Sequence, residues 1–222
     1  MTVLHLADEG EAADLAAFLS RLLHYDRGAA VRLQAAGTAL AVFGRPPSFE
    51  VLAIRAVRLA KPYENGLEVT LDVTVSAGEL LESVDEKGAT AVVPGEVTGP
   101  PWAGVLPPRG GWRPEPGLPA PDALRSLVAA VVAEFRSRTQ ELPDERRTRA
   151  ELDRIGRDIW SRTVGDTRLP VRAVHAAQSL GFLRPGAPPA LFSSGAWLRL
   201  RTPYGSIAVR RAGLGALDVS VR

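Results

Sequence analysis

The stretch AVRLQAAGTALAVFGRPPSFEVLAIRAVRL, residues 30–59, contains three runs that are typical of β-strands. Apolar and polar residues alternate in Ala30–Ala35, and a tight turn at Ala36–Gly37 leads into the second run, Thr38–Phe43. The third run, Phe49–Leu59, is nearly continuous Val, Leu and Ile, as in a strand that is buried on both faces. The stretch therefore predicts three neighbouring strands of a sheet.

A fourth strand and a helix are predicted on either side of this stretch. Leu67–Val75 alternates between apolar and polar residues, and Glu64-Asn65-Gly66 before it is a strong hairpin signal. These short links favour an antiparallel meander. In Glu11–His24 the apolar residues recur at helical spacing, so we expect a helix that packs across one face of the sheet.

The chain changes character after this region. Pro94–Pro121 holds nine prolines, which prevents regular helix or strand hydrogen bonding. Trp102 and Trp112 lie within it, and leaving such large apolar groups in water costs about 1.5–3 kcal/mol each. We therefore expect this segment to wrap over the surface with both indoles docked.

Three helices and a hairpin are predicted in the rest of the chain. The helices begin at Asp122, at about Asp144 and at Pro170, and the hairpin pairs Ala196–Arg201 with Ser206–Arg210. The predicted fold class is α+β, an antiparallel sheet with packed helices plus a C-terminal three-helix and β-hairpin portion. The predicted divisions are a helix-and-sheet domain, a Pro/Gly-rich wrap or linker, and a helical portion, with one fused core as the alternative: 1–98, 99–118 and 119–222.

Composition narrows the function classes. The chain has no Cys, which excludes disulfides, thiolate metal sites and Cys nucleophiles. The acidic N-terminus does not resemble a secretory signal, and no apolar run has the length of a membrane span, so we expect a cytoplasmic protein with no membrane contact. Charge is uneven: residues 1–141 carry 13 basic and 18 acidic side chains, whereas residues 142–222 carry 14 and 7. The basic excess can attract an acidic partner or neutralise the acidic half.

The usual catalytic and nucleotide-binding motifs are absent, and the three His residues lack ligand spacing, so we assign no catalytic residue, metal or cofactor. His24 and Asp26, at the end of the first helix, are candidates for proton transfer or ligand capping, or they simply complement the helix terminus. His175, in the third C-terminal helix, is a candidate partner-binding residue, with packing as the alternative. Arg157, Asp158 and Arg162 are its expected neighbours.

The C-terminal hairpin is the strongest candidate surface. Strand alternation places Trp197, Arg199 and Arg201 on one face, with Tyr204 at the turn and Arg210 on the return strand. Arginines beside aromatic rings can hold phosphates and stack on bases, and helices followed by a basic hairpin are similar to a winged helix-turn-helix. The alternative is an edge hairpin, or a contact between two copies of the chain, in which the arginines form a charged rim.

Three function classes follow. The first hypothesis is a non-enzymatic binding or interaction protein. The second is nucleic-acid binding through the basic C-terminal third. The third is an enzyme with a site in the groove between the halves, using His24 or His175. The partner stays unidentified, with a homodimer, an acidic protein or a nucleic acid as candidates.

Three segments also suggest a family: LLHYDRGAAVRLQAAGTALAVFGRPP (Leu22–Pro47), IWSRTVGDTRLPVRAVHAAQSLGFL (Ile159–Leu183) and GAWLRLRTPYGSIAVRR (Gly195–Arg211). Together with the Trp- and Pro-containing segment they resemble a conserved family restricted to actinobacteria, of the kind called actinobacterial signature proteins, for which no activity is assigned. The resemblance implies a lineage-specific, cytoplasmic and regulatory protein. It transfers no catalytic residue, because its motifs are not chemical ones.

Overall fold

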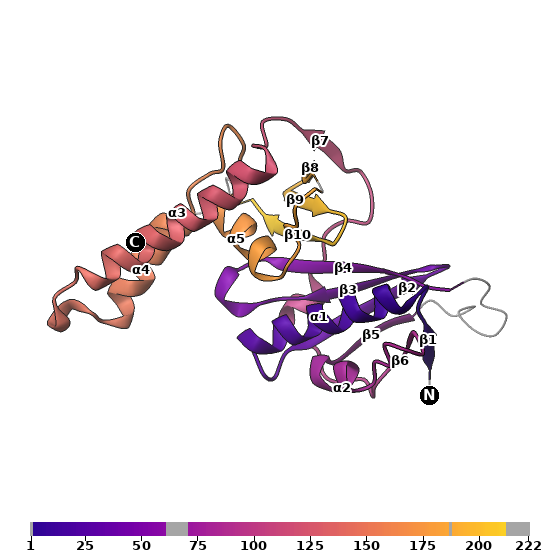
Figure 1. Ribbon diagram of the computed structural model, residues 1–222. Coiled ribbons are helices and arrows are strands. Elements are labelled where there is room, and N and C mark those ends of the chain that lie inside the picture. The colour runs from indigo at the N-terminus through magenta and orange to yellow at the C-terminus, as the bar shows by residue number, and fades with distance from the viewer. Residues whose placement is uncertain (1, 61–70, 187, 212–222) are drawn as a thin grey trace, which may run out of the picture.

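The computed structural model describes residues 2–60, 71–186 and 188–211 of the 222-residue chain. Its main element is an eight-stranded antiparallel sheet with the strand order β5-β2-β3-β4-β10-β9-β8-β7 (Figure 1). A two-stranded sheet pairs β1 with β6. The bounds are β1 Val3–His5, β2 Ala30–Ala36, β3 Ala39–Gly44, β4 Leu52–Arg58, β5 Leu71–Ser76, β6 Thr90–Val92, β7 Arg113–Glu115, β8 Ala190–Ser194, β9 Trp197–Thr202 and β10 Gly205–Arg210.

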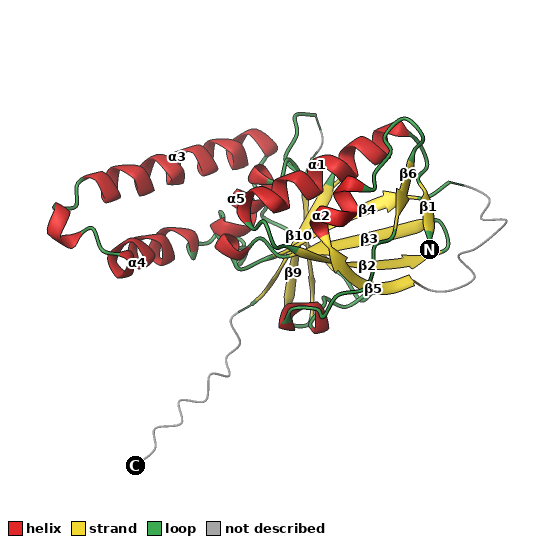
Figure 2. Ribbon diagram, turned by 90° about the horizontal axis from the view of Figure 1, so that it is seen from below, coloured by secondary structure: helices red, strands yellow, loops and turns green. Residues whose placement is uncertain are grey.

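Helices and three short 3-10 turns complete the fold, which confirms the α+β class. Their bounds are α1 Glu9–Tyr25, η1 Pro47–Phe49, α2 Ala77–Glu82, η2 Pro101–Gly104, α3 Pro121–Gln140, η3 Asp144–Arg146, α4 Arg149–Trp160 and α5 Val171–Ser179. Figure 2 shows α1 and α2 on one face of the sheet, while α3 and α4 project away from it. None of the helices in the described part of the chain is long and apolar enough to cross a membrane.

The first helix forms where the sequence predicts it. The Asp8 carboxylate caps its N-terminus by accepting a hydrogen bond from the Glu11 backbone N–H at 2.9 Å. Its buried stripe faces the sheet and consists of Ala12, Leu15, Phe18, Leu19 and Leu22. The face of the sheet beneath α1 and α5 is called here the inner face, and the opposite one the outer face.

The predicted meander is confirmed for β2, β3 and β4, which pair antiparallel in chain order, but its last link is wrong. β5 pairs with β2 instead of β4, and the turn at residues 64–66 lies outside the described residues. The edge of β4 that the meander would give to β5 is taken by β10, with Ile207 opposite Ala53. β4 is therefore a central strand, which agrees with its continuous apolar sequence. A local turn signal could not reveal that a strand 150 residues away competes for the same edge.

This β4–β10 pairing makes one sheet from both halves of the chain. The main apolar core also contains residues from both, and the rings of Phe18 and Phe182 stack with centroids 5.7 Å apart. The division at 98 and 118 stays a prediction, because a shared sheet does not define where a folding unit ends.

The Pro-rich segment 99–118 contacts the outer face. Trp102 and Leu106 pack there on a small apolar cluster that includes Phe43 and Ile54, which confirms the expected docking of Trp102. Trp112 is half-buried and belongs to neither apolar cluster of the described residues. Its indole N–H instead donates a hydrogen bond to the Pro108 carbonyl at 3.0 Å. Trp112 is therefore held by polar contacts within the segment.

The C-terminal half holds the three predicted helices and two unpredicted strands. α4 begins later than expected, after η3, because Thr148 caps it by accepting a hydrogen bond from the Glu151 N–H at 3.3 Å. β9 and β10 form the predicted hairpin, while β7 and β8 extend the sheet beyond it.

Candidate functional site

The structure places His24 and Asp26 at the exposed end of α1. The Asp26 carboxylate accepts a hydrogen bond from the Gly28 N–H at 3.0 Å, and the His24 ring meets Tyr25 edge-on at 5.3 Å. Within the described ranges, no hydrogen bond or ion pair joins His24 to Asp26. The two residues therefore have the geometry of a helix terminus, and their role in proton transfer or ligand capping stays a prediction.

His175 lies in a row of aromatic rings between the two halves. Its ring stacks on Trp160, with centroids 4.6 Å apart and planes at 17°, and meets Phe49 edge-on at 5.0 Å. Burial lowers the pKa of His175, because desolvation disfavours the charged imidazolium. The ring contacts of His175 are therefore with Trp160 and Phe49. Arg157, one of its expected neighbours on α4, lines the same cavity as His175.

These rings line a cavity of about 890 Å³, called here the aromatic cleft. η1 and the end of α1 form one wall, and α3, α4 and α5 form the other. The carboxylates of Glu50 and Asp153 also line it, together with Arg172. The rings that line it are Tyr25, Phe49, Phe135, Trp160 and His175.

The predicted hairpin residues have two different environments, the outer face of the sheet and the β9–β10 turn. On the outer face, Arg199 lies 5.7 Å from the Trp112 ring centroid and Arg210 lies 5.9 Å from that of Trp197, while Arg201 is exposed. Tyr204, at the turn, is structural: its carbonyl accepts a hydrogen bond from Arg55 at 2.8 Å, and Arg184 stacks 4.1 Å above its ring.

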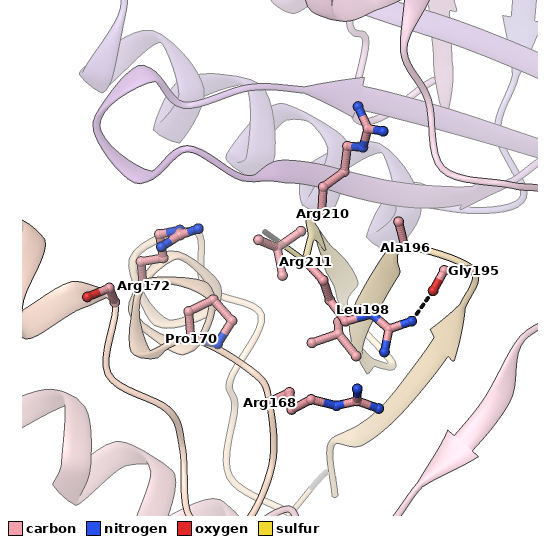
Figure 3. Close-up of a pocket in the computed structure, with 10 residues that line it drawn as sticks. Arg168, Pro170, Arg172, Gly195, Ala196, Leu198, Arg210 and Arg211 are labelled. Atoms are coloured by element: carbon pink, nitrogen blue, oxygen red, sulfur yellow. Dashed lines mark hydrogen bonds between the residues drawn. The ribbon is translucent and has the colours of Figure 1, made fainter. Parts of the chain in front are cut away.

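A second cavity, of about 670 Å³, lies between the start of α5 and the end of the hairpin (Figure 3). Leu198 and Val209 form its apolar floor, with Pro170 beside them. Among the described residues, four arginines and no carboxylate line it, and it is called here the arginine pocket. The arginines are Arg168, Arg172, Arg210 and Arg211.

Local structure positions these arginines. Arg168 stands between two buried anchors, Thr167 and Leu169. The Thr167 hydroxyl donates a hydrogen bond to the Val164 carbonyl at 2.6 Å and accepts one from the Leu169 N–H at 3.1 Å. Pro170 then caps α5 with extended backbone geometry, so that Arg172 falls in the first turn of the helix.

The pocket keeps an excess of positive charge. Neither the Arg168 nor the Arg172 side chain makes an ion pair or a hydrogen bond with any residue that the structure describes, and the Nε atom of Arg172 is buried without a partner. Arg211 donates a hydrogen bond to the Gly195 carbonyl, which leaves its charge uncompensated (Figure 3). The Arg210 guanidinium points away from the floor in the same view.

Guanidinium groups bind phosphate and carboxylate oxygens through paired hydrogen bonds of defined geometry. Three arginines around an apolar floor can therefore hold an anionic group together with part of its carbon skeleton. Among the predicted site residues only Arg210 touches this pocket. Arg168 was missed, and the only signal for it was the basic excess after residue 142.

The arginine pocket and the aromatic cleft adjoin. Ser161 and Arg172 line both cavities, so the two cavities meet at these residues. In the part of the chain that the structure describes, no cluster of three or more His, Asp and Glu residues could hold a metal ion.

Two family models match the chain. Residues 1–104 match a domain of unknown function, DUF8010, and residues 107–214 match another, DUF8185. No curated protein shows significant similarity. The arginine pocket lies entirely within the second match, whereas the aromatic cleft takes its walls from both.

Proposed function

We propose that the protein binds an anionic ligand, whose phosphate or carboxylate groups enter the arginine pocket. The observation that carries this proposal is the charge of the described lining residues: four are arginines and none is a carboxylate, and the side chains of two of the arginines have no partner among the described residues. Several other arginines are matched to acids, as in the pairs Arg162–Glu134 at 2.7 Å and Arg138–Asp158 at 2.6 Å. An external anion would supply the missing counter-charge.

Binding is favoured over catalysis by the chemistry of the lining. A guanidinium stays protonated across the physiological pH range, so it can hold an anion but cannot exchange protons as a general acid or base. An enzyme between the halves remains a hypothesis centred on the aromatic cleft, where His175 and two carboxylates are found. The ring contacts of His175 are with Trp160 and Phe49, so this alternative would require its side chain to move.

Isothermal titration with pyrophosphate at low ionic strength tests the proposal. We expect saturable binding to one site that weakens as salt is added, because mobile ions screen the arginines. Arg172→Gln should weaken binding at least tenfold, since a charge-assisted hydrogen bond is lost from the centre of the pocket. Arg162→Gln is the matched control: this arginine precedes the pocket in sequence, is exposed and is paired with Glu134, so affinity should not change.

Two results would reject the proposal. One is the lack of binding at low salt by a protein that melts cooperatively. The other is equal affinity for the wild type and for Arg172→Gln, when both have the same melting temperature.

Nucleic-acid binding is the second candidate. It is favoured by the exposed Arg201 and Arg210 beside Trp197, but α5 is poorly placed as a recognition helix, because most of it is buried against the sheet. A gel shift against duplex and single-stranded DNA at two salt concentrations separates the candidates. Retardation that is lost in Arg201→Ala/Arg210→Ala, but not in Arg172→Gln, would place the binding surface on the outer face.

The remaining predictions from the sequence concern the protein in the cell. Cytoplasmic location, restriction to actinobacteria, a regulatory role and a homodimeric or acidic protein partner all stay predictions. An anion-binding pocket is compatible with regulation by a small phosphorylated or carboxylated metabolite.

A further inference from the structure

A third cavity, of about 430 Å³, lies on the outer face of the sheet, on the opposite side from α1. Strands β2, β3, β4 and β9 form its floor, and the Pro-rich segment covers it with Pro107 and Pro108. The centre of the floor is apolar, with Ala41, Phe43 and Ile54. It is called here the outer-face pocket.

Arg199 enters this pocket without a counter-ion. The side chain is half-buried, its Nε atom is buried without a hydrogen-bond partner, and it pairs with no acid among the described residues. Burial lowers the pKa of Arg199, and the neighbouring charge of Arg201 lowers it further. Its one aromatic contact is the Trp112 ring, 5.7 Å away. Partial burial of an unpaired cation is costly, and a bound anion would remove that cost.

The carboxylate of Asp72, beside this cavity, already accepts hydrogen bonds from protein side chains. Asp72 also lines the pocket, but its Oδ1 accepts a hydrogen bond from Arg32 Nε at 2.8 Å and its Oδ2 accepts one from Gln34 Nε2 at 3.1 Å. These contacts hold the pKa of Asp72 below its ordinary value, so Asp72 stays ionised. Asp72 would repel a multiply charged anion. A single carboxylate directed at Arg199 would not have to displace an existing ion pair.

We propose that the outer-face pocket binds a small carboxylic acid with an apolar body. The carboxylate pairs with Arg199, with Arg109 as a second cation at the rim, and the hydrocarbon part lies on Phe43 and Ile54. The cavity has the size of a typical small-molecule site, and it combines an apolar lining with a few placed polar groups. Arg199 does not line the arginine pocket, so this site is independent of the proposed function.

Calorimetric titration with octanoate tests this site, with 1-octanol as the uncharged probe of the same length. We expect octanoate to bind at a single site and to change the fluorescence of Trp112, and 1-octanol to bind at least tenfold more weakly. Arg199→Gln should reduce octanoate affinity to that of 1-octanol. Arg201→Gln is the matched control, because Arg201 lies on the same strand and face but is exposed and outside the pocket.

A second variant addresses the floor of the pocket. Ala41→Phe adds bulk to the partly exposed floor position and leaves Arg199 in place, so octanoate binding should be lost while the fold persists. Pyrophosphate should not compete with octanoate, which keeps the outcome separate from that of the arginine pocket. Equal affinity for octanoate and 1-octanol, unchanged binding by Arg199→Gln or Ala41→Phe, or no octanoate binding at all would each overturn the proposal.

Discussion

The arginines of this protein have three kinds of environment. Arg55 is 4% exposed and pairs with Glu11 at 2.9 Å and with Asp14 at 3.3 Å. Arg162 is an exposed partner of Glu134, whereas Arg172 and Arg199 make no ion pair with any described residue. The Nε atom is buried without a hydrogen-bond partner in Arg55, Arg172 and Arg199 alike, so the ion pairs and not this atom separate the three environments. No sequence pattern distinguishes these cases, because the partner of an arginine can lie 44 residues away, as Glu11 does from Arg55. This is why the sequence predicted a basic region but not the pocket.

Among single residues, His175 should also make the free energy of unfolding depend on pH. Burial lowers its pKa in the folded protein, whereas in the unfolded chain it titrates near its ordinary value of about 6.5. Below that pH the unfolded state binds more protons, so the free energy of unfolding falls as the pH is lowered from 7 to 5. Arg157, Arg172 and Asp153 line the same cleft.

Melting temperatures at several pH values check this prediction. His175→Phe keeps an aromatic ring between Trp160 and Phe49 but cannot titrate, so it should lose less stability than the wild type between pH 7 and pH 5. The exposed His24 provides the control, and His24→Gln should follow the wild type. If His175→Phe and the wild type have parallel pH profiles, His175 is not the group responsible.

At the scale of elements, periodicity predicted single elements better than their pairing. The alternation in β9 correctly places Leu198 and Leu200 on the buried face and Arg201 on the exposed one. β7 and β8 were missed because both are short, and Arg113–Glu115 contains a proline that argues against a strand. The β4–β5 hairpin was wrong because a turn signal describes one link and not the competition between strands for an edge.

Arg55 holds α1 to the rest of the fold. It connects β4 to Glu11 on α1 and to the Tyr204 carbonyl at the β9–β10 turn. Arg55→Ala leaves Glu11, whose side chain is 11% exposed, without its buried partner, and should lower the free energy of unfolding by about 3–5 kcal/mol.

Urea denaturation measures this effect, and Arg58→Ala is the comparison. Arg58 binds the same carboxylate at 2.8 Å, but its side chain is 71% exposed, so water screens the interaction and the loss should be much smaller. Equal losses in the two variants would show that burial does not set the strength of this ion pair.

At the scale of the molecule, the uneven charge of the chain serves two purposes. Part of the C-terminal excess neutralises the acidic N-terminal half directly, as in the contact of Arg184 with Asp14 at 2.8 Å. Another part gathers at the arginine pocket, whose described lining residues include no acid. The shared sheet places this pocket beside the aromatic cleft. Neither the contact of Arg184 with Asp14 nor the position of this pocket could be predicted without the β4–β10 pairing.

NMR of the arginine Nε–Hε groups would show directly whether the arginine pocket binds an anion. In ¹⁵N-labelled protein, with resonances assigned by Arg172→Lys and Arg162→Lys, pyrophosphate should shift the Arg172 signal in a saturable way. The signal of Arg162, which is already paired with Glu134, should stay in place. Equal shifts of the two signals would mean diffuse attraction to surface charge, and an unmoved Arg172 signal at saturating pyrophosphate would contradict the account.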